Sequence, residues 1–89
     1  MSDRVERIRE TLQAAFAPER LAVHDDSHLH AGHAGAATGK GHFRVEIVSA
    51  AFAGLLPLQR HRAVYAALDA LMQTEIHALS VSARAPGEI

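Results

Sequence analysis

Apolar residues recur at helical spacing near the start of the chain and predict an amphipathic helix there. The apolar stripe consists of Val5, Ile8, Leu12, Ala15 and Phe16. Charged residues fill the positions between them, so one face is suited to burial and the other to water. Asp3 followed three positions later by Glu6 is typical of a capping box at a helix start. Pro18 ends the predicted helix.

Two later segments alternate between apolar and polar residues, which is the pattern of half-buried β-strands. A short strand is predicted over residues 21–24 and a longer one over 42–49. The longer strand places three apolar residues on one face, namely Phe43, Val45 and Ile47. Residues 25–41 show no periodicity, and a loop of this length in a small domain is usually functional or disordered. Because glycines stand at 32, 35, 39 and 41, we expect this loop to be long and flexible.

A second helical stripe begins at Pro57, which suits a first turn because its missing N–H would be unpaired there. This helix should last to about Gln73, and a third strand should follow over 76–83. The order αββαβ predicts one α/β domain, residues 1–89, with a three-stranded mixed sheet and both helices packed on one face. The expected core residues are Phe43, Val45, Ile47, Leu68, Leu71, Leu79 and Val81.

The composition narrows the function classes. The chain has 89 residues, 48% of them hydrophobic and 21% charged, as in an ordinary globular domain. A net charge of −1 gives no general attraction to nucleic acid or anionic lipid. The N-terminus lacks the apolar segment of a signal peptide, and no apolar run approaches the ~20 residues of a membrane span. We therefore expect a cytoplasmic protein without membrane contact.

Histidine is the unusual residue, because the chain has seven histidines and no cysteine. Five of them crowd into one segment: His24, His28, His30, His33 and His42. Imidazole is a common metal ligand and changes its charge near neutral pH, so the segment is a candidate loop for binding a metal or sensing protons. The absence of thiols excludes a disulfide framework and a catalytic thiol on this chain. A metal centre that prefers sulfur would have to find it on another molecule.

Four short motifs follow one another along the chain. They are Asp26-Ser27 before the histidine-bearing loop, S-x-x-F-x-G at Ser49, Phe52 and Gly54, R-H-R-x-V-Y at 60–65, and I-H-A-L at 76–79. In this order they resemble the BolA family, and the match runs from Val5 to Ala85. The resemblance implies an αββαβ fold similar to class II KH domains. It implies an adaptor and not an enzyme.

The same resemblance implies a partner and a cofactor. BolA-like chains pair with monothiol glutaredoxins of the CGFS type and hold a bridging [2Fe-2S] cluster. The glutaredoxin cysteine and glutathione supply sulfur, and the BolA-like chain supplies two ligands. One ligand would be His77, the histidine of I-H-A-L. The other would come from the loop, where counting from Ser27 selects His30, counting back from His42 selects His33, and His28 is a third option.

Residue spacing alone leaves less specific interpretations open. Strand alternation places His77 on the same side as Leu79, Val81 and Ala83, which would make it a histidine at the margin of the core. His61 falls on the apolar stripe of the second helix. Arg60 and Arg62 point elsewhere, where they could contact glutathione, a partner carboxylate or phosphate, or simply face solvent.

Two further functions remain as alternatives. A nucleic-acid-binding regulator, with DNA as partner, would need one basic face built from Lys40, Arg44, Arg60 and Arg62. A zinc site could be formed by the His-x-His-x-x-His pattern of the loop. An enzyme is not expected, and a weak homodimer of the chain alone stays open.

Overall fold

The computed structural model describes residues 4–27 and 40–88, which form helices and three strands. The elements are α1 (Arg4–Phe16), β1 (Arg20–Asp25), β2 (Gly41–Val48), the 3-10 turn η3 (Ala50–Phe52), α2 (Pro57–Ala67), α3 (Asp69–Thr74) and β3 (Ile76–Arg84). None of the helices in the described ranges is both long and apolar enough to span a bilayer.

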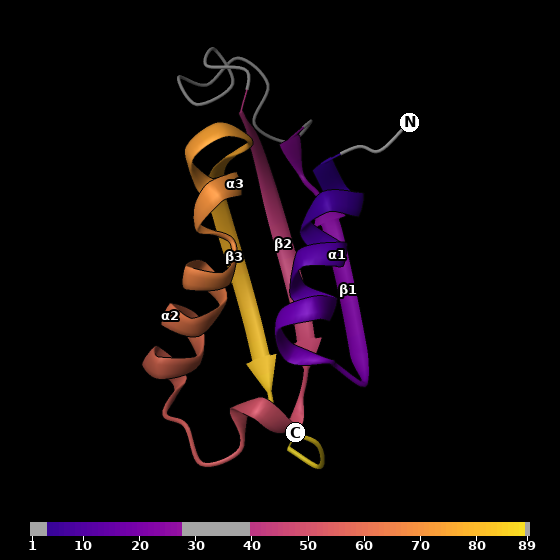
Figure 1. The fold of residues 1–89 in the computed structure, drawn as a ribbon, viewed down its shortest axis with the longest axis vertical. Coiled ribbons are helices and arrows are strands. Elements are labelled where there is room, and N and C mark those ends of the chain that lie inside the picture. Colours follow the sequence, from indigo (N-terminus) through magenta and orange to yellow (C-terminus); the bar gives the residue numbers. More distant parts are fainter. Residues whose placement is uncertain (1–3, 28–39, 89) are drawn as a thin grey trace.

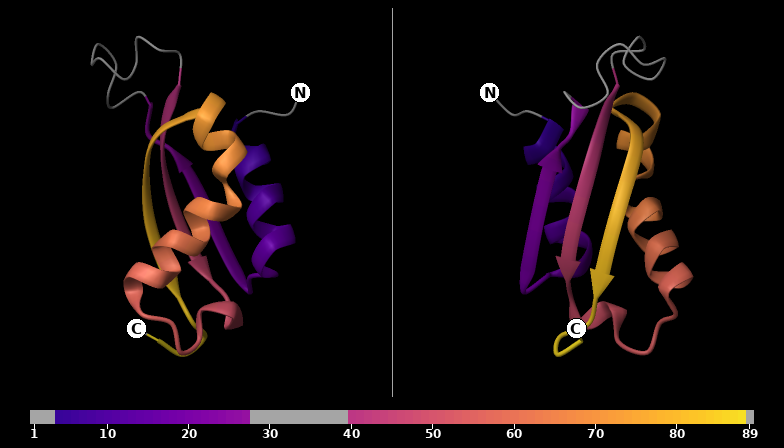
Figure 2. Two further views of the ribbon diagram at one scale, coloured as in Figure 1. Left: turned by 60° about the vertical axis from the view of Figure 1, so that its left-hand side comes forward. Right: turned by 180° about the vertical axis from the view of Figure 1, so that it is seen from behind.

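The three strands form one mixed sheet in the order β1-β2-β3. β1 pairs with β2 antiparallel, whereas β2 and β3 are parallel. A parallel pair needs a long crossover, and α2 with α3 supplies it. Figure 1 and the two views of Figure 2 show all helices on one side of the sheet. The predicted three-stranded mixed sheet with helices on one face is confirmed.

On the other side of the sheet lies no helix of residues 4–27 and 40–88, and we call this side the open face (Figure 2, right). On β2 the burial pattern alternates strictly, so every second residue belongs to this face. The strand residues that share it are Arg20, Ala22 and His24 of β1, His42, Arg44, Glu46 and Val48 of β2, and Ala78, Ser80, Ser82 and Arg84 of β3.

The core lies between the sheet and the helices. Its fully buried members are Ile8, Leu12, Phe43, Val45, Ile47, Phe52, Val64, Leu68 and Ile76. Four of the seven predicted core residues are among them. The other three, Leu71, Leu79 and Val81, are half-buried and pack against this cluster. Phe52 was not among the predicted core residues. Its ring centroid lies 5.0 Å from that of Phe16, so the two rings pack against each other.

The prediction of a single helix from Pro57 to about Gln73 is wrong, because the chain bends at Leu68. That residue has φ −96° and ψ 11°, outside the helical region, and it separates α2 from α3. Its N–H still bonds to the carbonyl of Val64 at 3.1 Å, and its side chain is fully buried. No glycine or proline marks the bend. Tertiary packing of Leu68 therefore sets a bend that the local pattern does not encode.

Helix side chains cap carbonyl groups on both edge strands. The Tyr65 hydroxyl donates to the carbonyl of Leu79 at 2.7 Å, and Arg60 Nη1 donates to that of Ala83 at 3.3 Å. On the opposite edge, Arg9 Nη1 donates to the carbonyl of Leu21 at 3.4 Å. Uncapped edges invite pairing with other chains. The R-H-R-x-V-Y segment thus fastens α2 to β3 and covers part of its edge.

We predict that Tyr65→Phe lowers the free energy of unfolding by about 1 kcal/mol, because the carbonyl of Leu79 loses its donor while the ring is kept. Urea denaturation monitored by circular dichroism measures this change. Thr74→Val is the matched control, because it removes an exposed hydroxyl bonded to Ala70 at 3.4 Å. Equal stability losses in the two variants would contradict the capping role of Tyr65.

Candidate metal-ligand site

His77 is the extra residue of a β-bulge at the start of β3. Gly41 lies opposite Ile76, but the next residue of β2, His42, lies opposite Ala78, so His77 has no direct partner on β2. A bulge re-aims the side chain that it carries, and bulges are frequent next to functional sites. His77 is exposed to solvent. The bulge therefore presents an imidazole at the end of a rigid strand.

The bulge also corrects the side of the sheet predicted for His77. Leu79, Val81 and Ala83 are half-buried on the core side, whereas His77 is exposed and Ile76 is fully buried. The extra residue shifts the alternation by one position between Ile76 and Leu79. The strand pattern alone could not show this shift.

His42 lies beside His77, which sequence reasoning missed. The two ring centroids are 5.2 Å apart and the rings are inclined at 57°. Parallel pairing explains the contact, because β2 and β3 begin at the same end of the sheet (Figure 1). His42, but not His77, lines a cavity of about 250 Å³ on the open face, together with Asp26, Ala78 and Ser80. The signal available in the sequence was that both histidines stand near a strand start.

The described residues on either side of the loop are fastened to this site. The Ser27 hydroxyl accepts from the backbone N–H of His42 at 3.1 Å, and the N–H of Asp26 donates to the carbonyl of His42 at 2.8 Å. The strands include Asp25 and Gly41, so the connection is shorter at both ends than the predicted loop 25–41. The ligand candidates His28, His30 and His33 lie outside the described residues.

Gly41 was expected to loosen the loop, but it is a buried strand residue with a steric role. A Cβ atom on Gly41 would lie 2.6 Å from the Ser27 hydroxyl oxygen and 2.7 Å from the ring of Phe43. Both distances are shorter than any normal contact. Glycine is therefore required for the close approach that seats Ser27 against the start of β2.

Glu75 holds the turn that leads into the bulge. Its carboxylate accepts from Arg4 Nε at 2.9 Å and from Arg7 Nη1 at 3.0 Å, and only 19% of its side chain is exposed. Its carbonyl accepts from the N–H of Gly41 at 2.9 Å. One residue thus joins α1, the end of α3 and the start of β2 immediately before Ile76 and His77.

The predicted partner-contact residues Arg60, His61 and Arg62 are not brought to this site. Arg60 forms two bonds to the Glu88 carboxylate, at 2.5 and 2.8 Å, and a third from Nε to the carbonyl of Leu55 at 2.9 Å. Only 13% of its side chain is exposed, which argues against its predicted contact with glutathione or a partner. His61 stacks on Tyr65 with centroids 5.1 Å apart, and Arg62 is exposed.

The ion pair between Arg60 and Glu88 lowers the pKa of the Glu88 carboxyl group. The hydrogen bond from Arg60, followed by the one from the Ala85 N–H, lowers the pKa of Glu88 from an ordinary 4.5 to about 2. Glu88 therefore stays ionised through the whole physiological range. Arg60 fixes the C-terminal turn to α2 and β3.

Two of the four residues expected on one basic face, Arg44 and Arg60, lie on different sides of the sheet. Arg44 lies on the open face, where its Nε is 3.3 Å from Asp26 Oδ2. Arg60 belongs to α2, which covers the opposite side of the sheet, and its charge is paired with Glu88. Arg44 and Arg60, which a single basic face would bring together, therefore lie on opposite sides of the sheet.

The donor atoms at the site fit only part of a metal centre. Across residues 4–27 and 40–88, no group of three or more His, Cys, Asp or Glu side chains could hold a metal ion. His77 and its neighbour His42 offer nitrogen donors, and the chain has no cysteine. Within the described residues the site therefore offers two imidazoles and no sulfur donor.

Comparison with known proteins gives the family. Residues 12–88 match the family model described as BolA-like protein. The chain belongs to the BolA family. It is 46% identical over 81 residues to human BolA-like protein 1, a match that covers 91% of this chain and 57% of the relative's length. The chain thus spans little more than half of that protein.

Two further comparisons bear on function and fold. A relative from Escherichia coli (strain K12), named DNA-binding transcriptional regulator BolA, is 43% identical over 76 residues, covering 85% of this chain and 70% of the relative. The solved BolA domain of SufE1 from Arabidopsis thaliana superposes with a TM-score of 0.87 at 40% identity, covering 100% of this chain and 99% of that one. The BolA-type fold is therefore shown by both sequence and structure.

We predict that Gly41→Ala lowers the free energy of unfolding by about 1–3 kcal/mol, because the added methyl overpacks a buried contact. It should also shift the NMR signals of the His42 and His77 rings. Gly54→Ala is the control, because Gly54 has φ +79° and nothing within 4 Å, so its cost is backbone strain alone. Unchanged ring signals in Gly41→Ala would contradict the steric role of this glycine.

We predict that Glu88→Gln lowers the melting temperature at pH 5–7 and that this difference vanishes near pH 2. The pKa of Glu88 is lower in the folded chain than in the unfolded one, so its stabilisation is full above about pH 4.5 and is lost as the pH falls to about 2. Thermal melts at stepped pH measure it. Glu10→Gln, at an exposed position of α1, should show no such pH-dependent difference. A Glu88→Gln deficit that persisted at pH 2 would contradict the ion-pair assignment.

Proposed function

We propose that this BolA-family chain is an adaptor that pairs with a monothiol glutaredoxin to hold a bridging [2Fe-2S] cluster. It would act in the trafficking or assembly of such clusters, or in iron sensing. The observation that carries the proposal is His77, an exposed imidazole presented by a bulge. A ligand shared with a second protein must be accessible and fixed in direction, and His77 meets both requirements.

The composition of the chain supports a shared cluster. A [2Fe-2S] cluster takes four protein or thiol ligands, and imidazole can replace thiolate on one iron. With no cysteine, this chain can give no thiolate, and its imidazoles are the donors that replace thiolate on such a cluster. The glutaredoxin cysteine and glutathione would supply the two sulfur ligands. Histidine ligation also leaves a cluster with a higher potential than full thiolate ligation.

Chain length supports a second ligand from the loop. Ser27 is bonded to the N–H of His42, whose ring touches His77. His30 follows Ser27 by three residues, which an extended chain spans in about 10 Å. His33 follows three residues later. Chain length therefore allows either imidazole to reach towards His77, and His42 packs against His77 where it would restrict the rotation of that ring.

We predict that the isolated chain assembles no stable cluster and that its mixture with a CGFS glutaredoxin, glutathione, iron and sulfide does. His77→Ala should shorten the cluster lifetime far more than either loop change, because the Nε2 atom of its neighbour His42 is buried and cannot take its place. His33 should partly rescue His30→Ala, and the double variant should match His77→Ala. The measurement is anaerobic visible circular dichroism combined with size-exclusion chromatography.

His24→Ala and His61→Ala are the matched controls. His24 pairs with Glu46 on the open face, and His61 stacks on Tyr65, so neither adjoins His77. Both variants should keep the wild-type lifetime. If His77→Ala left the lifetime unchanged while His61→Ala abolished it, the site would belong to the R-H-R segment and the assignment would be wrong. A coloured, cluster-loaded chain purified without glutaredoxin and glutathione would overturn the shared-cluster proposal.

A nucleic-acid-binding regulator is the second candidate function, supported by the name of the Escherichia coli relative. The pairing of Arg44 with Asp26 and of Arg60 with Glu88 disfavours it. Neither arginine offers an uncompensated charge to a phosphate backbone. The adaptor function therefore has the stronger physical support.

A further inference from the structure

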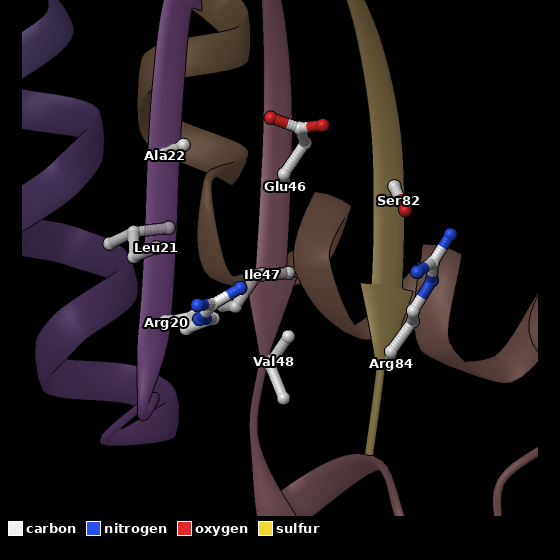
Figure 3. Close-up of a pocket in the computed structure, with 8 residues that line it drawn as sticks. All are labelled: Arg20, Leu21, Ala22, Glu46, Ile47, Val48, Ser82 and Arg84. Atoms are coloured by element: carbon white, nitrogen blue, oxygen red, sulfur yellow. The ribbon is translucent and has the colours of Figure 1, made fainter. Parts of the chain in front are cut away.

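A depression of about 420 Å³ lies on the open face, at the end of the sheet remote from His77. All three strands contribute to it, as Figure 3 shows. Its lining includes Arg20 and Ala22 of β1, Glu46 and Val48 of β2, and Ser82 and Arg84 of β3. None of these residues takes part in the candidate metal-ligand site or in the R-H-R segment.

Strand register places two arginines on either side of one apolar residue. Arg20 lies opposite Val48 on one side, and Arg84 lies opposite Val48 on the other. Two strand spacings separate their backbones, which is about 10 Å. Figure 3 shows both side chains on the same side of the sheet, with the Arg84 guanidinium beside Ser82. Two guanidinium groups thus flank a floor made by Val48 and Ala22.

These two arginines differ from the other charged strand residues of the open face. His24 is paired with Glu46 at 3.0 Å, and Arg44 with Asp26 at 3.3 Å. Within the described ranges, neither Arg20 nor Arg84 has a carboxylate oxygen within the 4.0 Å of an ion pair. Glu88 lies close enough to feel the charge of Arg84, but both of its oxygens are bonded to Arg60. The depression therefore holds two guanidinium groups that form no ion pair within the described ranges, and the Glu46 carboxylate on its wall is paired with His24.

We propose that this depression binds a single phosphate group through Arg20 and Arg84. Guanidinium groups are planar forks of donors that match phosphate oxygens, and two of them balance the double charge of a phosphate. The Ser82 hydroxyl adds a donor, and the apolar floor suits the carbon skeleton of a small phosphate ester. Glu46 on the remaining wall repels a second anionic group, so the site accepts one phosphate and not a polyphosphate.

The experiment titrates the whole chain with inorganic phosphate and, separately, with acetate at constant ionic strength, with chloride as the compensating ion. Backbone amides of Ala22, Val48 and Ser82 and the Nε–H groups of the two arginines report binding by NMR. Phosphate should give saturable shifts at these positions, and acetate should bind more weakly because it carries one charge. Arg20→Gln and Arg84→Gln should each weaken phosphate binding about tenfold or more, since each removes a charge-assisted hydrogen bond.

Two further variants test whether phosphate affinity depends on the charge at Glu46 and whether the loss of affinity is confined to Arg20 and Arg84. Glu46→Gln should strengthen phosphate binding, because it removes a like charge from the wall. Arg44→Gln is the matched control on the same face and should leave the affinity unchanged, because Arg44 is already paired with Asp26. All four positions are exposed, so the variants should melt near the wild-type temperature. Shifts that do not saturate, acetate binding as tight as phosphate, or an equal loss in Arg44→Gln would each overturn the proposal.

Discussion

The parallel pairing of β2 and β3 with one extra residue at its start is the constraint on which the candidate site depends. Parallel pairing puts the beginnings of both strands at one end of the sheet, so His42 and His77 become neighbours although 35 positions separate them in the sequence. The extra residue then turns His77 away from the core while Ile76 on one side and Leu79 on the other stay packed. Without the extra residue, strand alternation would place His77 on the core side with Leu79. With it, the side chain of His77 is exposed.

The surroundings of the bulge are built to keep it in place. Glu75 joins two arginines of α1 to the turn before β3, and its carbonyl holds the N–H of Gly41. Gly41 in turn leaves room for Ser27, which is bonded to the N–H of His42. Side chains from α2 fasten the middle and far end of β3. The end of the sheet that carries His77 is thus held by contacts from three elements, while the arginine-lined depression occupies the other end of the open face.

The sequence predicted the elements that depend on local periodicity and missed those that depend on contacts distant in the chain. Alternation of apolar residues located β2 and its buried face, and the stripe after Pro57 located α2. The bend at Leu68 has no glycine or proline to mark it, because packing imposes it. The pairing of Arg60 with Glu88 joins positions 28 residues apart, and the bulge follows from strand register. Motif resemblance selected His77, but only register explains why its side chain is accessible.

The most direct test of the account is a measurement of the nitrogen ligands in the complex of this chain with a CGFS glutaredoxin. Pulsed electron paramagnetic resonance of the reduced cluster, with ¹⁵N-histidine incorporated only into this chain, detects imidazoles bound to iron. The account predicts strong ¹⁵N couplings from two imidazoles, one of which disappears in His77→Ala while His24→Ala changes nothing. Couplings that are absent in the wild type, or identical in the wild type and His77→Ala, would contradict it.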